Sequence, residues 1–184
     1  MGDHSLGCPK TSDRIARHNL LRDVLFETAA SADLGPIKEE KNLLPGTGDV
    51  TIRRWSNGKD GAIDVTVTSP LCPSNVVEAA AEAGAALAKA YNRKMKDTAE
   101  ACRREGIAFL PFAMETLGGL HPGAVATARQ LAAALARCKG VEGSVVTSQL
   151  FGRLSLTLMR ANAVMISTRC QDANLLQALV DGIQ

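Results

Sequence analysis

Two aspartates stand in neighbouring strand-like segments of this chain. Asp49 opens the string DVTIRRW, and Asp64 lies inside GAIDVTVTS, between Ile63 and Val65. A carboxylate in such apolar surroundings costs free energy unless a partner compensates its charge. Mg²⁺ prefers a few carboxylate oxygens together with waters and a phosphate. One hypothesis is therefore a divalent metal site with Asp49 and Asp64 as its ligands.

The geometry of a hairpin allows this pairing. Asn57-Gly58 is a strong signal for a tight turn between the two segments. With the turn there, Asp64 pairs near Thr51, and Asp49 lies two positions along the same strand. Side chains alternate with period two, so both carboxylates face one side, about 7–8 Å apart on the diagonal. Two alternatives stay open: Asp49 is a turn residue, or Asp64 pairs with a nearby Lys or Arg.

The segments around the hairpin predict an α/β domain. Helical periodicity, strand-like runs and Gly/Pro punctuation indicate a helix over 11–33, strands over 37–44, 49–55 and 61–69, a long helix over 75–105, a strand over 107–114, a helix over 122–139, and a mostly helical remainder over 144–184. Short turns make the first three strands a meander. The long helix then crosses over and brings the fourth strand beside the sheet.

Composition narrows the class of protein. The chain has 184 residues, of which 46% are hydrophobic and only 3% aromatic, which suits one domain with an aliphatic core. Five scattered cysteines without a CxxC pair predict a reducing, intracellular setting. We expect no signal peptide and no membrane segment. Residues 121–171 are basic, which predicts a polyanionic partner or a solvated helical surface.

The order of elements resembles the PD-(D/E)xK restriction-endonuclease-like fold. Three longer strings, RHNLLRDVLFETA (17–29), GDV…W…G…IDVTVTSPL (48–71) and NRKMKDTAEACRREGIAFLPFAMETLGG (92–119), resemble the endonuclease-like segment of reverse-transcriptase-bearing, non-LTR retroelement proteins. The resemblance covers roughly residues 2–119. It implies an endonuclease-like core of helix, three-stranded meander, helix and strand, with extra C-terminal helices.

The resemblance also implies a chemistry. Asp49 and Asp64 take the positions of the two acids that bind Mg²⁺ or Mn²⁺, with no organic cofactor. The chain departs from the pattern at Thr66, where a lysine is expected, and at Gly48, where a proline is usual. Lys94, in the following helix, is then the candidate that orients the water or stabilises charge on the phosphate. The alternative is that Lys94 is a solvated helix charge.

Further site residues complete the prediction. In many members of the fold an acid on the first helix approaches the metal, and we expect Glu27 in that catalytic role in preference to Asp23, which can pair with an arginine instead. Glu115, after the buried strand, is another candidate. We expect DNA to be bound by four basic residues: Arg93, Lys96, Arg129 and Arg137.

The sequence predicts three segments of the chain and leaves three candidate functions. Residues 1–10 hold His4 and Cys8, spaced like half a zinc knuckle; two ligands make no structural Zn²⁺ site, so a truncated knuckle or disordered tail is expected. Residues 11–140 form the endonuclease-like core, and 141–184 a helical extension. We expect a nuclear, metal-dependent DNA nicking domain, with DNA and other parts of a retroelement polyprotein as partners. The alternatives are an inactive relative that binds nucleic acid or protein, and an unrelated structural α/β domain.

Overall fold

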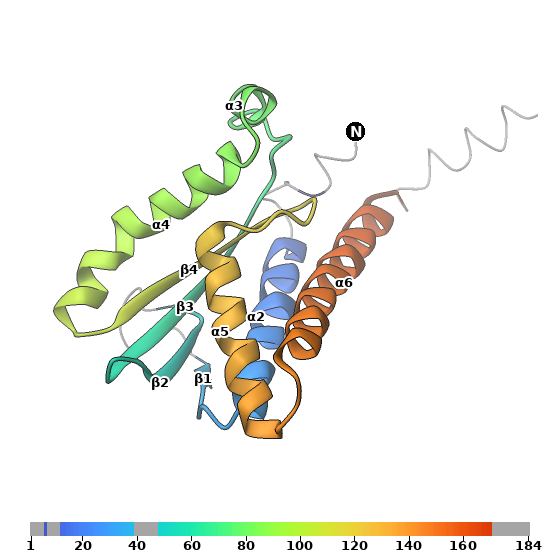
Figure 1. Ribbon diagram of the computed structural model, residues 1–184. Coiled ribbons are helices and arrows are strands. Elements are labelled where there is room, and N and C mark those ends of the chain that lie inside the picture. Colours follow the sequence, from blue (N-terminus) through green and yellow to red (C-terminus); the bar gives the residue numbers. More distant parts are fainter. Residues whose placement is uncertain (1–5, 7–11, 39–47, 171–184) are drawn as a thin grey trace, which may run out of the picture.

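The fold is seen in a computed structural model that describes residue 6 and the ranges 12–38 and 48–170 (Figure 1). Its elements are α2 (Asp13–Ser31), β1 (Ile37–Lys38), β2 (Val50–Ser56), β3 (Lys59–Thr68), α3 (Val76–Ala81), α4 (Ala85–Arg104), β4 (Ala108–Glu115), α5 (Pro122–Lys139) and α6 (Gly143–Cys170). The predicted α/β class is confirmed.

The four strands form one mixed sheet in the order β1-β2-β3-β4. β1, β2 and β3 pair antiparallel, while β3 and β4 pair parallel after the crossover through α3 and α4. Asn57 and Gly58 have φ values of 51° and 74°, as a two-residue hairpin turn requires. The predicted meander, turn and crossover are therefore present.

The two faces of the sheet are covered differently. Val50, Ile63 and Val65 are buried in a core that also receives side chains from α2, α5 and α6. Alternate residues of β3 face the other way, toward α4, where Asp64 meets a lysine of that helix. Figure 1 shows α4 along one side of the sheet and the other three long helices grouped on the opposite side. Asp64 therefore lies on the side of the sheet that α4 covers.

Two predicted elements differ from the structure. The strand over 37–44 is described only as β1, Ile37–Lys38, and residues 39–47 lie outside the described part of the chain. The helix over 75–105 is two helices, because Gly84 adopts a left-handed conformation with φ of 84° after an extended Glu82. Such a φ is accessible to glycine at little cost and interrupts the helical hydrogen bonds.

The first part of the predicted C-terminal helical extension over 141–184 is α6. α6 packs against α5 and α2, and its Leu150, Leu154 and Leu158 are buried in the same core as the sheet. The predicted zinc-knuckle remnant, apart from Leu6, and residues 171–184 lie outside the described residues. None of the described helices combines the length and hydropathy that crossing a bilayer requires.

Candidate active site

Asp49 and Asp64 lie side by side. The backbone N–H of Asp49 donates to the carbonyl oxygen of Ile63 at 2.7 Å. The carboxylate Oδ2 of Asp49 accepts the backbone N–H of Val65, also at 2.7 Å. Asp49 thus bonds to both chain neighbours of Asp64, which places the two carboxyl groups next to each other.

The hairpin register brings the two acids closer than the predicted diagonal. Thr51 pairs with Ala62 rather than with Asp64, because the ladder is interrupted between Ile52 and Ser56. In that interval Arg54 has φ of 52°, a conformation that bulges tolerate. The shift relative to the predicted pairing is even, so the face of the side chains is unchanged. A bulge therefore places two like charges together at the start of β2.

Lys94 reaches this pair from the middle of α4. Its Nζ lies 2.8 Å from Oδ2 and 3.1 Å from Oδ1 of Asp64. The Asp64 side chain is only 12% exposed and that of Lys94 30% exposed, so the ion pair is largely shielded from water. Thr66, which stands where the resembled pattern has lysine, is buried and polar. Lys94 of α4 thus pairs with Asp64, although position 66 of β3 carries no lysine.

A fourth residue, His18, was not among the predicted site residues. It lies on α2, and its Nε2 is 3.0 Å from Oδ2 of Asp49. Asp49 stands directly before the start of β2, and His18 is the residue of α2 that contacts it. The only sequence signal was the position of His18 within the string RHN, which carries no indication of a partner thirty-one residues away.

The pKa values of the two aspartates are shifted in opposite directions. Burial raises the pKa of Asp64; Lys94 offsets this in part, and the charge of Asp49 adds to it. Burial also opposes ionisation of Asp49, but the bonds from His18 and Val65 outweigh it and lower its pKa. The bond to Asp49 raises the pKa of His18 in spite of burial. Adjacent titratable groups with pKa values pushed apart are typical of functional sites.

The predicted third acid lies elsewhere. Glu27 is exposed and pairs with Arg153 of α6 at 2.7 Å. It stands nine residues after His18, about 13 Å along the helix axis. Asp23 pairs with Arg22 and Lys38. The expectation that Glu27 reaches the site is therefore not met, and His18 is the residue of α2 that does.

Glu115 also lies away from the pair. It stands at the level of Thr68 in the parallel register, whereas Asp64 is level with Pro111. Four residues along a strand correspond to about 13 Å. Burial raises the pKa of the Glu115 carboxyl. The pKa of Glu115 is thus raised although Glu115 lies outside the candidate active site.

The predicted DNA-binding residues do not form one surface. Arg93 and Lys96 are exposed on α4, and Arg129 and Arg137 are exposed on α5. These two helices cover opposite faces of the sheet (Figure 1). Only Arg93 and Lys96 therefore lie on the helix that carries Lys94 and forms the site.

The donor set fits a hard cation. Two carboxylates supply oxygen ligands, and Mg²⁺ commonly takes one or two carboxylates plus waters. Over residues 6, 12–38 and 48–170, no cluster of three or more His, Cys, Asp or Glu side chains is arranged to hold a metal. A structural zinc site, which needs four protein ligands, does not fit this part of the chain.

No protein-family model, curated protein or solved structure matches the chain. The likeness to retroelement endonucleases therefore remains a prediction from the sequence strings, and the site is interpreted from its own geometry.

Proposed function

We propose that the chain is a metal-dependent endonuclease domain that nicks DNA. The observation that carries the proposal is the convergence of Asp49, directly before β2, with Asp64 of β3 and Lys94 of α4. Two acids can hold a metal ion that activates a water, and a lysine can stabilise charge on a phosphate, so this set of groups suits phosphodiester hydrolysis. The resemblance of the strings to retroelement endonucleases supports DNA as the substrate.

Each residue has a separate task in this proposal. Asp49 and Asp64 would hold Mg²⁺ or Mn²⁺. When bound, such an ion activates a water and polarises the phosphate. His18 donates to Asp49 and keeps that carboxylate ionised and oriented. Lys94 supplies an ammonium group beside Asp64, where it can stabilise negative charge that develops on a phosphate oxygen.

The charge balance supports cation binding at the pair. Asp64 has a raised pKa because it is buried and lies next to Asp49. Lys94 offsets this effect only in part. A divalent cation that both carboxylates share would remove the repulsion and favour the ionised form of each.

The test is a plasmid assay with the whole chain. We expect Mg²⁺ or Mn²⁺ to convert supercoiled plasmid to the open-circular form, and we expect EDTA to stop the conversion. An Asp49→Asn variant should be inactive under the same conditions. Conversion that is insensitive to EDTA, or equal in Asp49→Asn, would overturn the proposal.

A second function is favoured by a different observation. Each carboxylate is already bonded to a basic side chain, Asp49 to His18 and Asp64 to Lys94. Such a neutralised cluster is also what a relative that binds nucleic acid without cleaving it would retain. Binding of DNA in a gel-shift assay, with no nicking in Mg²⁺ or Mn²⁺, would select this function.

A further inference from the structure

A polar cavity opens where β3 ends, away from the hairpin turn. Its volume is about 270 Å³, which is near the lower end for small-ligand sites. The walls come from α2, the end of β3, the segment before α3, and α4, and include Arg14, Arg17, Ser69, Asn75, Lys89 and Arg93. Among the described residues that line it, none is acidic. The composition indicates an anion site.

Two of the four basic residues of this cavity are available to a ligand. Lys89 already donates to Ser74 O at 2.7 Å and pairs with Glu78 at 2.9 Å. The buried Arg17 donates to Asn162 Oδ1 and Leu6 O. Arg14 and Arg93 are exposed, and neither has a hydrogen bond or ion pair within the described part of the chain. Two guanidinium groups thus face the cavity from two different helices.

The floor of the cavity is fixed in place. Asn75 is 7% exposed, and its Nδ2 donates to Thr68 Oγ1 at 3.2 Å and to Ser69 O at 2.9 Å. Ser69 is equally buried. These bonds hold the segment before α3 against the end of β3, so this part of the cavity wall is fixed by polar contacts.

The cavity is linked to the candidate active site by two of the elements that build that site, α4 and β3. Arg93 directly precedes Lys94 on α4, and Thr68 stands four residues beyond Asp64 on β3. Four strand residues span about 13 Å. That length corresponds to the rise of about four nucleotides along the axis of a DNA duplex, at about 3.4 Å each.

We propose that this cavity binds a backbone phosphate of the DNA on which Asp49 and Asp64 act, through Arg14 and Arg93. The inference rests on the proposed function for the identity of the strand. A guanidinium group offers parallel N–H donors that match two phosphate oxygens, which an exposed lysine does not. The contact fixes the position of the strand relative to Lys94 without reading its sequence.

The test compares two double variants by fluorescence anisotropy with a labelled DNA duplex, over a series of salt concentrations and in EDTA so that no cleavage occurs. Arg14→Ala/Arg93→Ala should weaken binding about tenfold and reduce the slope of log K against log salt by about 2.

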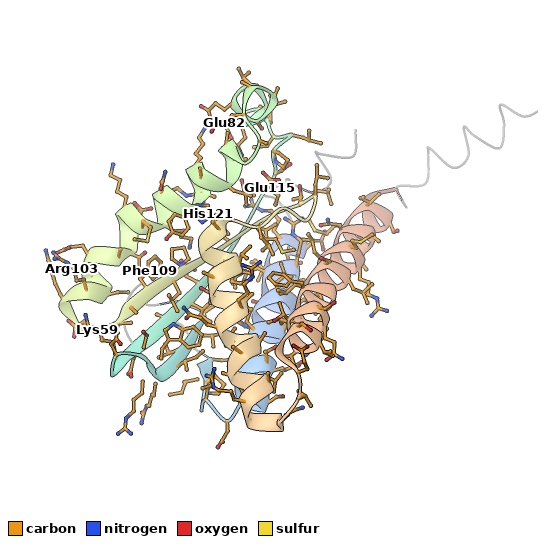
Figure 2. All side chains as sticks on the ribbon, in the orientation of Figure 1. Lys59, Glu82, Arg103, Phe109, Glu115 and His121 are labelled. Atoms are coloured by element: carbon orange, nitrogen blue, oxygen red, sulfur yellow. The ribbon has the colours of Figure 1, made fainter. Side chains whose placement is uncertain are left out.

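The control, Arg103→Ala/Arg104→Ala, removes the same charge at the far end of α4, where both arginines pair with Glu100. Figure 2 shows Arg103 at the opposite end of this helix from Glu82. The control should bind within about twofold of the wild type and keep most of its salt slope.

A third variant, Arg14→Lys/Arg93→Lys, separates charge from shape. It should keep the salt slope and recover only part of the affinity. Equal binding by Arg14→Ala/Arg93→Ala and the control would overturn the inference even if the wild type nicks DNA. Competition by inorganic phosphate with no loss of DNA binding in the variant would also overturn it and leave a small-anion site. If Arg14→Ala/Arg93→Ala alone loses DNA binding and the wild type does not nick DNA, the phosphate site in the cavity is supported and the proposed nuclease function is refuted.

Discussion

Lys94 Nζ lies 2.8 Å from Asp64 Oδ2, although thirty residues separate the two along the chain. The contact joins α4 to the face of β3 that lies outside the main core. It explains how a charge is kept inside a strand between Ile63 and Val65. The negative charge of Asp64 is therefore compensated by Lys94 of α4.

Removal of the lysine should destabilise the fold. Lys94→Met leaves Asp64 with its burial and its acidic neighbour but without its cation, which should cost about 2 kcal/mol in the free energy of unfolding. Lys96→Met, on the same helix and exposed, should change it by less than about 0.5 kcal/mol. Urea denaturation at pH 7 measures both. Equal values for the two variants would show that the ion pair contributes nothing to stability.

The same pair should be coupled in a double-mutant cycle. Asp64→Asn removes the charge that Lys94 compensates, so Lys94→Met should cost less in that background than in the wild type. Full additivity of the two changes would mean that the 2.8 Å contact is not energetically significant.

The His18–Asp49 bond should make stability depend on pH. The pKa of His18 is raised above its ordinary value by the bond to Asp49, so its contribution is complete below about pH 6.5 and is lost as pH rises through the folded-state pKa. The pKa of Asp49 is lowered, so its contribution is present above about pH 4 and is lost as pH falls through its folded-state pKa. The bond is therefore strongest between these limits.

His18→Gln tests this dependence. It should destabilise the protein by about 1 kcal/mol at pH 5.5 and by less at pH 9, because the contribution of protonated His18 is lost as pH rises through its folded-state pKa. Denaturation curves at the two pH values give the difference. In an Asp49→Asn background the difference should disappear, and its persistence there would assign it to another group.

The cation should stabilise the folded chain. At ten times its dissociation constant a ligand of the native state adds about 1.4 kcal/mol, which raises Tm by about 3 °C or more in a chain of this size. We expect Mg²⁺ to do so for the wild type and not for Asp49→Asn/Asp64→Asn. A thermal melt with and without Mg²⁺ measures the shift. An equal shift in both proteins would place the cation at another location.

Two glycines should respond in opposite directions to alanine. A Cβ at Gly61 would lie 2.7 Å from the Trp55 ring, so Gly61→Ala should cost about 1–3 kcal/mol. A Cβ at Gly152, within α6, meets nothing within 4 Å, so Gly152→Ala should stabilise by about 0.5–1 kcal/mol. Thermal unfolding distinguishes the two signs, and a stabilising Gly61→Ala would refute the close packing of Trp55.

The fold was largely predictable from the sequence because its signals are local. Alternating apolar residues and the Asn57-Gly58 turn specify the hairpin, and the apolar run over 107–114 corresponds to β4, Ala108–Glu115. The interruption at Gly84 was missed because alanines on both sides favour helix, and a single glycine is tolerated inside many helices. The role of α6 in the core was missed because its partners lie on α2 and α5, far along the chain.

The site was predictable in part for the same reason. Asp49 and Asp64 are joined by one short hairpin, so strand alternation alone places them on one face. The bulge at Arg54 that brings them into contact has no reliable sequence signal. The choice of Glu27 rested on residue type, whereas the outcome, a contact from His18, depends on which turn of α2 lies beside Asp49.

The central claim is tested most directly by nicking of supercoiled plasmid in Mg²⁺, with the wild type beside Asp64→Asn and Glu27→Gln. Glu27 is a matched acid on α2 that the structure pairs with Arg153, outside the site. We predict that the wild type and Glu27→Gln nick at similar rates, and that Asp64→Asn is slower by at least about a hundredfold. Equal rates for the wild type and a folded Asp64→Asn variant, or no nicking by the wild type, would contradict the account.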